Sequence, residues 1–590
     1  MVGLPMVDVV ISGKKVRGLL DTGCSNTIVK ANLVKDWDGA SYVKTFDGRT
    51  TKCVGYAWVD VNLSGFKVRV KVIGAENLLP GVEAVIGMDV IREVGPVIVK
   101  GNNVEIQGLH HVATIASARE RPIDNIEDKD FSARFDGFVW TVEWKWKNGC
   151  TPELKNMAEN YTDGLPSETL KAYEAEVNRW IDEGILLPWE GECEGVLPLM
   201  AVVQPTKKKV RPVLDFRELN QYVECHTGDD EINICGDKLR EWRQTQGELE
   251  IVDLKAAYLQ IRVEKHLWKH QIVRFKGKTY CLTRLGFGLS VAPRVMTVVL
   301  KRVLGQDAVI KSATSAYIDD ILVNTSIVKA GDVIDHLTRF GLESKPPELL
   351  DGGTALGLKL NRRKDGTLGF TRGNDVPEIP EFVTKRMLFS ICGKMVGHYP
   401  IAGWLRVACS YMKRVSEGSS WDDDVGQVAR DKLVEVRNRI RSDDPVKGAW
   451  TVPHQDSGIV WCDASNIAMG AMLEIGGVMV EDRAWLRKAN DFNHINVAEL
   501  DSVSRGFNMA VDWGLKELQI KTDSATVRSW VQLTLSEERP IKTKGAAEVL
   551  VKRRLGTLKT LIDELGMKVS VELVVSHENR ADVLTRVPKV

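Results

Sequence analysis

The chain lacks the features of a membrane, secreted or zinc-binding protein. No hydrophobic run approaches the roughly 18 residues that a membrane-spanning helix needs, and charged residues interrupt the N-terminal segment, unlike a signal peptide. The ten cysteines include no CxxC pair and no metal-ligand spacing, so we expect reduced thiols rather than zinc ligands or disulfide bonds. The sequence therefore predicts a soluble, intracellular protein without a membrane partner.

An excess of either charge is also absent. Lys plus Arg and Asp plus Glu both number 80 among 590 residues, so nucleic acid would have to bind at local basic patches. Hydrophobic residues make up 44% of the chain and charged residues 27%, a balance typical of globular domains. This length corresponds to about three to five domains, and motifs of three kinds occur along it.

The first motif is a turn that carries a carboxylate. Asp21 begins an Asp-Thr-Gly sequence with hydrophobic residues on both sides. A carboxylate between buried strands has a pKa that can shift, which suits acid–base chemistry. Asp-Thr-Gly alone is a common turn sequence, but residues 59–72 alternate as strands do, and residues 84–91 supply a second hydrophobic stretch around a glycine.

These features of residues 1–105 resemble a retropepsin, the retroviral-type aspartic protease. The resemblance implies an all-β domain that cleaves a polyprotein, with Asp21 as the catalytic residue and with Thr22 and Gly23 shaping the turn. The chemistry needs two carboxylates that share a proton, so a homodimer would have to supply the second one. Residues 46–49 are a candidate for the hairpin turn of the flap.

Residues 106–165 form a predicted connector with one aromatic stretch. The aromatic side chains of residues 138–146 could stack on bases, but a strand that buries one face is the favoured interpretation. From Tyr173 to Ile181, hydrophobic residues recur at helical spacing before Gly184. This pattern predicts a helix that leads into the next domain.

The second module contains three carboxylates in strand-like surroundings. Asp253 lies at the end of a hydrophobic run, and Asp319 and Asp320 lie side by side within the hydrophobic stretch 317–323. An adjacent Asp pair is most often a turn, but unpaired acids in buried strands are costly. Two Mg²⁺ ions would remove that cost by bridging the carboxylates to phosphate oxygens.

A basic segment, residues 207–211, precedes these acids. Solvated lysines on a hairpin would explain it by itself. Together with the acids, it resembles a reverse transcriptase, which implies an α+β right-hand polymerase. The resemblance implies fingers and palm over residues 166–360 and a thumb and connection region over residues 361–450.

By this resemblance, Asp253, Asp319 and Asp320 form the palm carboxylate triad, and five further residues bind the nucleotide. Lys209 and Arg211 would hold the triphosphate, a role that suits guanidinium geometry. Tyr258 would exclude a ribose 2′-hydroxyl, unless it is simply a core tyrosine. Phe287 lies in a segment similar to the family's F-G-L-x-x-A-P motif, and Lys345 is a candidate for protonating pyrophosphate.

The last module, residues 451–590, carries four acids on predicted elements that run strand, helix, strand, helix. They are Asp463, Glu499, Asp523 and Asp582. Any one of them could be a surface acid. The set resembles ribonuclease H, an α/β fold whose four acids hold two Mg²⁺ ions against an RNA phosphodiester. His577 lies near the fourth acid and is either a loop residue or a catalytic one.

The three modules together resemble the Pol polyprotein of a retrovirus or LTR retrotransposon. This resemblance implies an RNA-directed DNA polymerase that takes an RNA template, a DNA primer and dNTPs, degrades the RNA of RNA–DNA hybrids, and uses Mg²⁺ or Mn²⁺. It also implies a cytoplasmic location in virus-like particles. The alternatives are a decayed or domesticated copy that binds nucleic acid without turnover, and an active protease with an inert remainder.

Overall fold

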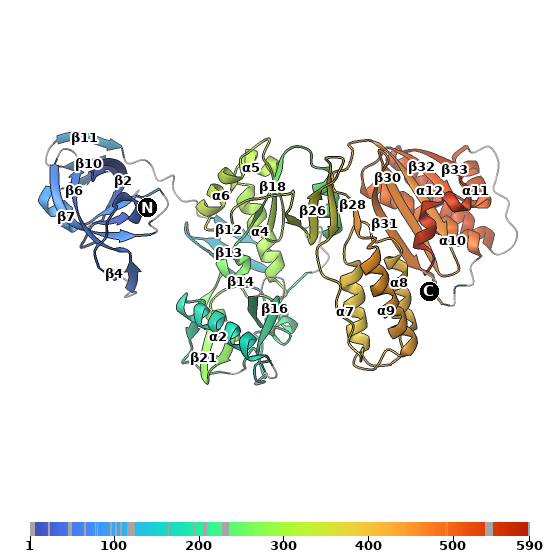
Figure 1. Ribbon diagram of the computed structural model, residues 1–590, viewed down its shortest axis with the longest axis horizontal. Helices are drawn as coiled ribbons and strands as arrows, with labels where there is room; N and C mark the ends of the chain where they lie inside the picture. The colour runs from blue at the N-terminus through green and yellow to red at the C-terminus, as the bar shows by residue number, and fades with distance from the viewer. Residues whose placement is uncertain are drawn as a thin grey trace. The chain divides into compact units, whose positions relative to one another are not determined.

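The protein divides into two compact units, Met1–Ile123 and Asp124–Val590, in a computed structural model (Figure 1). The structure describes residues 6–21, 24–39, 41–44, 50–63, 66–76, 78, 81–94, 97–100, 103–106, 109–114, 124–162, 165–193, 195–204, 209–226, 235–489, 491, 494–536 and 547–587.

The first unit contains a closed β-barrel with the strand order β1-β2-β8-β3-β7-β6. Alternate residues of its strand β6 are buried, as expected for a strand with one face in a core. The barrel strands are β1 (Met6–Ile11), β2 (Lys14–Leu20), β3 (Ile28–Lys30), β6 (Gly55–Leu63), β7 (Phe66–Ala75) and β8 (Ala84–Ile86). This architecture agrees with the predicted all-β domain.

Three smaller elements accompany the barrel. They are the hairpin β4 (Ser41–Lys44) and β5 (Thr50–Cys53), helix α1 (Met88–Val94), and a sheet of β9 (Val97–Lys100), β10 (Asn103–Ile106) and β11 (Leu109–Thr114). The predicted flap turn, 46–49, would join β4 to β5 but lies outside the described residues.

The second unit begins with residues that the sequence assigned to a connector. Strands β12 (Asp124–Glu127), β13 (Phe131–Phe135) and β14 (Trp140–Trp144) form a sheet with β19 (Arg262–Val263). The predicted connector, 106–165, therefore divides between the two units. Alternate residues of β14 are buried, which confirms the preferred interpretation of its tryptophans as one face of a strand.

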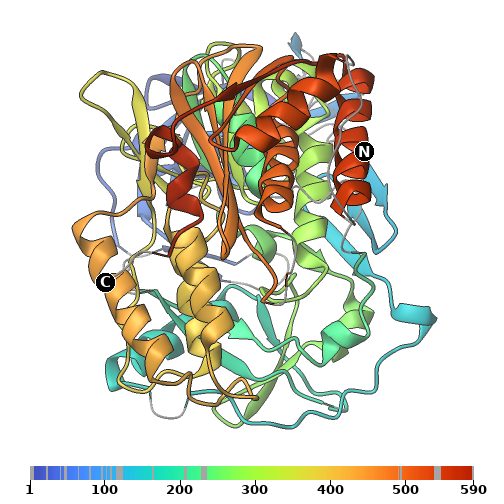
Figure 2. The same cartoon turned by 90° about the vertical axis from the view of Figure 1, so that its right-hand side faces the viewer.

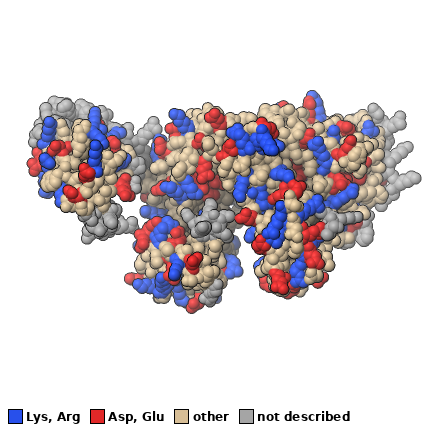
Figure 3. Space-filling model, viewed as in Figure 1, with Lys and Arg blue, Asp and Glu red and all other residues tan. Residues whose placement is uncertain are grey.

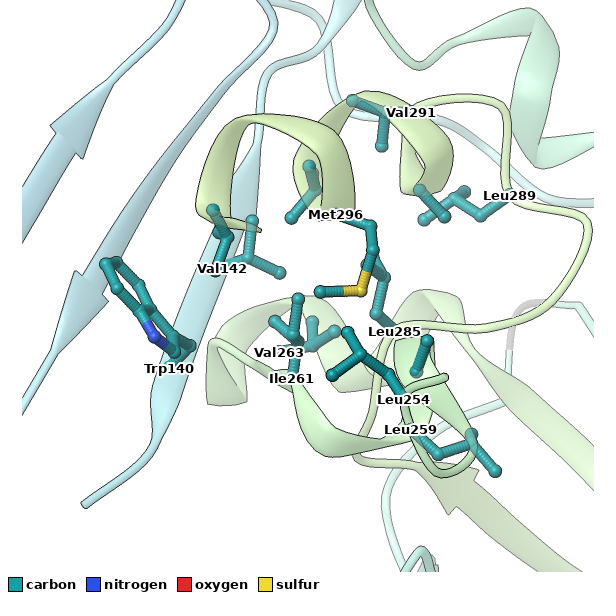
Figure 4. Close-up of a cluster of buried hydrophobic side chains, with 14 of the residues drawn as sticks. Trp140, Val142, Leu254, Leu259, Ile261, Val263, Leu285, Leu289, Val291 and Met296 are labelled. Carbon is teal, nitrogen blue, oxygen red and sulfur yellow. The ribbon is translucent and has the colours of Figure 1, made fainter. Parts of the chain in front are cut away.

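The core beneath this sheet joins segments that are far apart in the sequence. Figure 4 shows Val142 of β14, Val263 of β19 and Met296 of helix α4 (Ala292–Leu304) in one cluster. The segment that resembles the F-G-L-x-x-A-P motif contributes Leu285 and Leu289 to the same cluster. The cluster also contains Leu254, so this packing holds the motif next to the residue that follows the candidate polymerase acid Asp253.

The remaining elements before residue 350 build two further small sheets, a four-stranded sheet that we call the palm sheet after the predicted palm, and the helices around them. The helices are α2 (Ser167–Asp182), α3 (Cys235–Gln244), α5 (Ala308–Ala313) and α6 (Ala330–Arg339). The two small sheets consist of β15 (Leu186–Pro188), β20 (Ile272–Phe275) and β21 (Lys278–Leu282), and of β16 (Leu199–Gln204) and β17 (Lys209–Leu214). The palm sheet has the order β22-β23-β18-β24, with β18 (Leu249–Asp253), β22 (Thr314–Tyr317), β23 (Asp320–Asn324) and β24 (Glu348–Leu349). Helix α2 confirms the helix predicted before Gly184.

A second core unites a four-stranded sheet with three helices. The sheet contains β25 (Thr354–Ala355), β26 (Leu358–Arg362), β27 (Leu368–Arg372) and β28 (Lys447–Ala449), and the helices are α7 (Lys385–Val396), α8 (Leu405–Val415) and α9 (Gln427–Ser442). The boundary predicted at residue 361 falls inside β26, because this strand pairs with β27 and continues the sheet past that point.

The last part of the chain forms a five-stranded mixed sheet in the order β31-β30-β29-β32-β33. Its strands are β29 (Ser457–Ala464), β30 (Ala468–Ile475), β31 (Val478–Leu486), β32 (Glu517–Thr522) and β33 (Lys568–Leu573), and its helices are α10 (Ile495–Asp512), α11 (Ala525–Ser536) and α12 (Ala547–Leu565). Figure 2 shows these helices gathered beside the sheet. The predicted helix at Asp582 is a short 3₁₀ turn, η8 (Arg580–Leu584).

The surface of the second unit mixes both signs of charge. Figure 3 shows Lys and Arg interspersed with Asp and Glu over its visible face, with a gathering of basic residues over β26 and β27. Three exposed basic residues, Arg362, Arg363 and Lys364, lie at this hairpin. Within the described ranges, no helix is both long and hydrophobic enough to cross a membrane.

Candidate active sites

The candidate protease residue follows the end of a barrel strand. Asp21 is half-buried, and its backbone N–H donates to the carbonyl of Ile86 at 3.0 Å, because β2 and β8 run parallel there. The next two residues of the motif, Thr22 and Gly23, lie outside the described residues. The barrel therefore positions the carboxylate at the end of two paired strands.

A hydrogen-bond network ties the segment after Asp21 to the second hydrophobic stretch. Asp89 accepts hydrogen bonds from the Thr27 backbone at 2.8 Å and from the Thr27 hydroxyl at 2.7 Å. The same hydroxyl accepts from the Gly87 N–H at 3.1 Å. Only glycine fits there, since a Cβ on Gly87 would lie 2.6 Å from the backbone of Asn26. Sequence reasoning did not identify this bracing role of Thr27 and Asp89.

The three candidate polymerase acids meet on adjacent palm strands. Asp253 ends β18 and lies opposite Asp320, the first residue of β23. The carbonyl of Asp319 accepts from the Leu254 N–H at 3.0 Å. Ile318, the first residue of the hairpin turn, has a φ of 56°, which is strained for a β-branched side chain. This tight two-residue turn brings two acids together beside the third.

Crowding of these carboxylates disfavours full ionisation. Burial, reinforced by the charges of Asp319 and Asp253, raises the pKa of Asp320 to about 7. Burial and the charge of Asp253 also raise the pKa of Asp319, while Lys345 and Arg211 act in the opposite direction. The site therefore concentrates more negative charge than its own side chains neutralise, which suits a divalent cation.

Two of the predicted nucleotide-binding residues, Lys345 and Arg211, lie near the acids. Lys345 forms an ion pair with the Asp253 carboxylate through Nζ, and its backbone N–H donates to the Asp253 carbonyl at 2.8 Å. Arg211 is exposed on β17, and its charge acts on Asp319. The side chain of Lys209 lies outside the described residues.

The predicted sugar gate, Tyr258, packs against Phe287 of the segment that resembles the F-G-L-x-x-A-P motif. The rings of Tyr258 and Phe287 meet edge to face with centroids 4.9 Å apart. Burial and the nearby charge of Asp319 raise the pKa of Tyr258 to about 12, so its hydroxyl stays protonated. Behind them, a Cβ on Gly286 would lie 2.4 Å from the Phe216 ring, which leaves room only for glycine. Tyr258 is thus both partly buried and electrostatically coupled to the acids.

The four candidate nuclease acids come from four separate elements. Asp463 lies in β29, Glu499 in α10, Asp523 directly after β32 and Asp582 in η8. Strands β29 and β32 are parallel neighbours whose last paired residues are Cys462 and Thr522. The two following carboxylates therefore leave the same end of the sheet.

The fold brings these acids close enough for their charges to act on one another. Burial raises the pKa of Asp463 to about 6, and the charges of Asp523 and Asp582 add to this effect against a hydrogen bond from Thr585. Burial, with a contribution from Asp523, also raises the pKa of Glu499. One carboxylate oxygen of Glu499, Oε2, is buried without a hydrogen-bond partner among the described residues. A buried carboxylate oxygen that accepts no hydrogen bond and lies close to other acids is suited to bind a metal ion.

Neutral side chains, which the sequence did not reveal, donate to two of the candidate nuclease acids, and Arg586 pairs with Asp582. The Thr585 hydroxyl donates to Asp463 at 2.5 Å, and the Ser576 hydroxyl donates to Asp523 at 2.5 Å. Asn579 donates both to Asp523, at 3.2 Å, and to the carbonyl of Cys462, at 2.9 Å. His577 lies beside Ser576 in a short 3₁₀ turn and is exposed, so its role stays open.

A separate group of possible metal ligands lies elsewhere in the second unit. Asp130, Glu224 and His226 bring ligand atoms within 4.8 Å of one another. Asp130 is already paired, because it accepts from the His226 N–H at 2.9 Å and lies 3.4 Å from Nε of Arg294. These contacts explain the buried carboxylate without a metal.

Two segments of the chain match family models of known proteins. Residues 3–98 match the family of retroviral aspartyl proteases, and residues 384–442, which include α7 to α9, match a domain of unknown function (DUF7047). No curated protein matches the chain.

Two solved foamy viral structures share the fold at low identity. The first, a protease–reverse transcriptase in complex with double-stranded DNA, is 15% identical and has a TM-score of 0.54, covering 97% of this chain and 99% of that chain. The second, in complex with an RNA/DNA hybrid, is 14% identical and has a TM-score of 0.52, covering 100% of this chain and 78% of that chain. At the level of fold, these matches confirm the predicted resemblance to a Pol polyprotein that joins a protease to a reverse transcriptase.

Proposed function

We propose that this Pol-like chain is an RNA-directed DNA polymerase that also degrades the RNA strand of its hybrid product and cleaves polyprotein through its first unit. The observation that carries the proposal is the meeting of Asp253, Asp319 and Asp320 on neighbouring palm strands, with a pKa of about 7 at Asp320. The foamy viral structures of the same fold contain double-stranded DNA or an RNA/DNA hybrid, which supports nucleic-acid substrates.

In the polymerase site, the three acids would hold Mg²⁺ or Mn²⁺. When bound, a pair of such ions neutralises charge on the attacking and leaving oxygens of the phosphoryl transfer. Arg211 would bind the triphosphate of the incoming dNTP. Lys345, now paired with Asp253, would hold a proton beside the departing pyrophosphate. Tyr258 would lie under the sugar and exclude a 2′-hydroxyl.

In the nuclease site, Asp463, Glu499, Asp523 and Asp582 would hold a second pair of Mg²⁺ ions. The unpartnered Oε2 of Glu499 and the raised pKa of Asp463 support cation binding there. Thr585 and Asn579 would keep two of the acids oriented before any ion binds. The substrate would be the RNA strand of an RNA–DNA hybrid.

The protease would act as a homodimer. The chain carries a single Asp-Thr-Gly sequence, and the reaction requires two carboxylates, one to activate water and one to protonate the leaving group. Asp21 from each of two chains would supply them. We further propose that the protein works in the cytoplasm, within virus-like particles.

Primer extension by the purified chain on an RNA template, with and without Mg²⁺, tests the proposed function. We expect metal-dependent DNA synthesis and loss of the RNA strand. The Asp21→Asn variant should retain both activities while losing cleavage of a polyprotein substrate. Absence of DNA synthesis by folded protein would favour an inert, nucleic-acid-binding copy, and proteolysis alone would favour a protease with an inert remainder.

A further inference from the structure

Strand β31 of the nuclease module is held on two sides by the polymerase module. Consecutive residues of a strand point to opposite faces. The two central acids of β31, Glu481 and Asp482, are consecutive, so their side chains point to opposite faces of the sheet. Glu481 pairs with helix α3, whereas Asp482 binds the loop between α7 and α8. The nuclease sheet is therefore joined directly to both the palm and the thumb region.

The contact on the palm side centres on a buried arginine. Arg243 of α3 is 1% exposed. Its guanidinium donates to the carbonyls of Ala449 at 3.0 Å, Trp450 at 3.2 Å and Val480 of β31 at 2.7 Å. The guanidinium lies 5.4 Å from the Trp513 ring. One side chain thus joins the palm helix, the end of β28 and the nuclease sheet.

An ion-pair network lies beside this arginine. Arg240 of α3 donates to both carboxylate oxygens of Glu481 at 3.3 Å. Glu481 also accepts from Arg483 at 2.8 Å and from the Trp513 indole at 2.8 Å. Burial alone would raise the pKa of Glu481, but Arg483 and Arg240 outweigh it and lower the pKa. The carboxylate therefore stays ionised within the junction.

The contact on the thumb side involves a fully buried acid. Asp482 is 0% exposed, and it accepts from the backbone N–H groups of Ala402 at 3.1 Å and Gly403 at 2.7 Å. It also pairs with Arg406, and its own N–H donates to the carbonyl of Pro400 at 2.9 Å. Buried charges with this many partners tolerate little displacement.

We infer that Arg243 is a positioning residue that fixes the nuclease site relative to the polymerase site on one duplex. The inference rests on the proposed function. None of the contacts of Arg243 described above involves an acid of either site. Removing this side chain would leave three carbonyls without their donor and loosen the junction, while each site keeps its own ligands. The distance between the primer 3′ end and the RNA cut would then vary over a wider range of positions.

The test maps RNA cuts relative to a recessed DNA primer 3′ end, with the full chain and without dNTPs. Wild type should cut within a narrow set of positions. In Arg243→Met the set should become about twofold wider, while primer extension and cleavage of a hybrid without a recessed end stay within about twofold of wild type. A merely structural role would lower both rates together without widening the set.

Two further variants keep the test decisive if Arg243→Met folds poorly. Arg240→Gln removes the ion pairs of this side chain with Glu481, Asp512 and Asp237 but leaves Arg243 in place, and it should widen the set to a smaller extent. Arg372→Met is the matched control, because Arg372 is 9% exposed and contacts Asp444 and Met395 rather than the nuclease module. We expect it to leave the cut positions unchanged.

The possible failures are distinguishable. Wild type without synthesis or cleavage would overturn the proposed function. If the wild type is active and both Arg243→Met and Arg240→Gln keep its narrow set of RNA cut positions, the positioning role alone would be overturned. Equal widening in Arg372→Met would also overturn it, because general loosening of the fold would then explain the effect.

Discussion

The proposed polymerase and nuclease sites gather carboxylates in different ways. The polymerase acids come from one pair of strands and a two-residue turn, and a cation, Lys345, pairs with Asp253. The nuclease acids come from four elements spread over the last module. Thr585 and Asn579 donate to two of these acids, and Arg586 pairs with Asp582. The register of one strand pair thus builds the first site, whereas packing among four elements builds the second.

The two sites also share an electrostatic feature. Burial, with a contribution from neighbouring acids, raises a carboxyl pKa in each site, to about 7 at Asp320 and about 6 at Asp463. The polymerase site has three candidate metal ligands, whereas the nuclease site has four. We therefore expect the polymerase site to depend more strongly on each of its acids.

The largest expected effect comes from removing one polymerase acid. Asp319→Asn should lower primer extension by about 10³-fold or more, because several kcal/mol of charge stabilisation by metal would be lost. Cleavage of a preformed hybrid should stay near wild type. Asp332→Asn, an exposed acid on α6, is the matched control. Extension near the wild-type rate in Asp319→Asn would mean that the palm is misassigned.

The corresponding change in the nuclease should have a smaller effect, since three acids remain. Asp463→Asn should slow cleavage of the RNA strand by about 10²-fold while primer extension continues. Gel analysis of a labelled hybrid measures this rate, with the exposed Asp563→Asn of α12 as the control. Undiminished cleavage by pure Asp463→Asn protein would refute the site.

A change in the predicted sugar gate should affect only the polymerase activity and leave the nuclease activity unchanged. Tyr258→Val removes the ring that packs against Phe287 and should reduce discrimination against ribonucleotides by about tenfold. Incorporation of rNTPs and dNTPs by single-nucleotide extension provides the measurement, and hybrid cleavage should not change. Unaltered sugar selection would indicate that Tyr258 is a core residue.

The smallest effect is on stability in the absence of metal. Because the folded-state pKa values of Asp320 and Asp463 lie above the usual carboxyl value, protonation stabilises the fold at low pH and this stability is lost as pH rises through those values. Asp320→Asn should therefore raise Tm by about 2–4 °C at pH 8 but not near pH 4. The gain in Tm should increase with pH and level off above about pH 7 for Asp320→Asn and above about pH 6 for Asp463→Asn. Thermal melts in EDTA that show a gain independent of pH would contradict this explanation, and Mg²⁺ should remove the gain.

The same comparison explains what could be predicted from the sequence. Asp319 and Asp320 are adjacent in the chain, and their hydrophobic flanks predict strands, which β22 and β23 confirm. The turn at Ile318 and Asp319 was not predicted, because the strand-like flanks argued against a turn at this pair. The three-module fold and the helix of Glu499 also follow from pattern and resemblance.

The remaining features depend on contacts that no local pattern encodes. Thr585 and Asn579 reach their acids only after η8 packs against β29 and β30. Strand β14, within the predicted connector, pairs with β19, more than a hundred residues later. The role of Arg243 likewise depends on a carbonyl of β31 that is distant in sequence.

The most direct test of the central claim is a crystal structure with Mn²⁺ and an RNA–DNA hybrid, analysed by anomalous scattering. The account predicts a pair of peaks bridged by Asp253 and Asp319, and a second pair among the nuclease acids. The absence of manganese from both carboxylate clusters, in crystals that contain the hybrid, would contradict it.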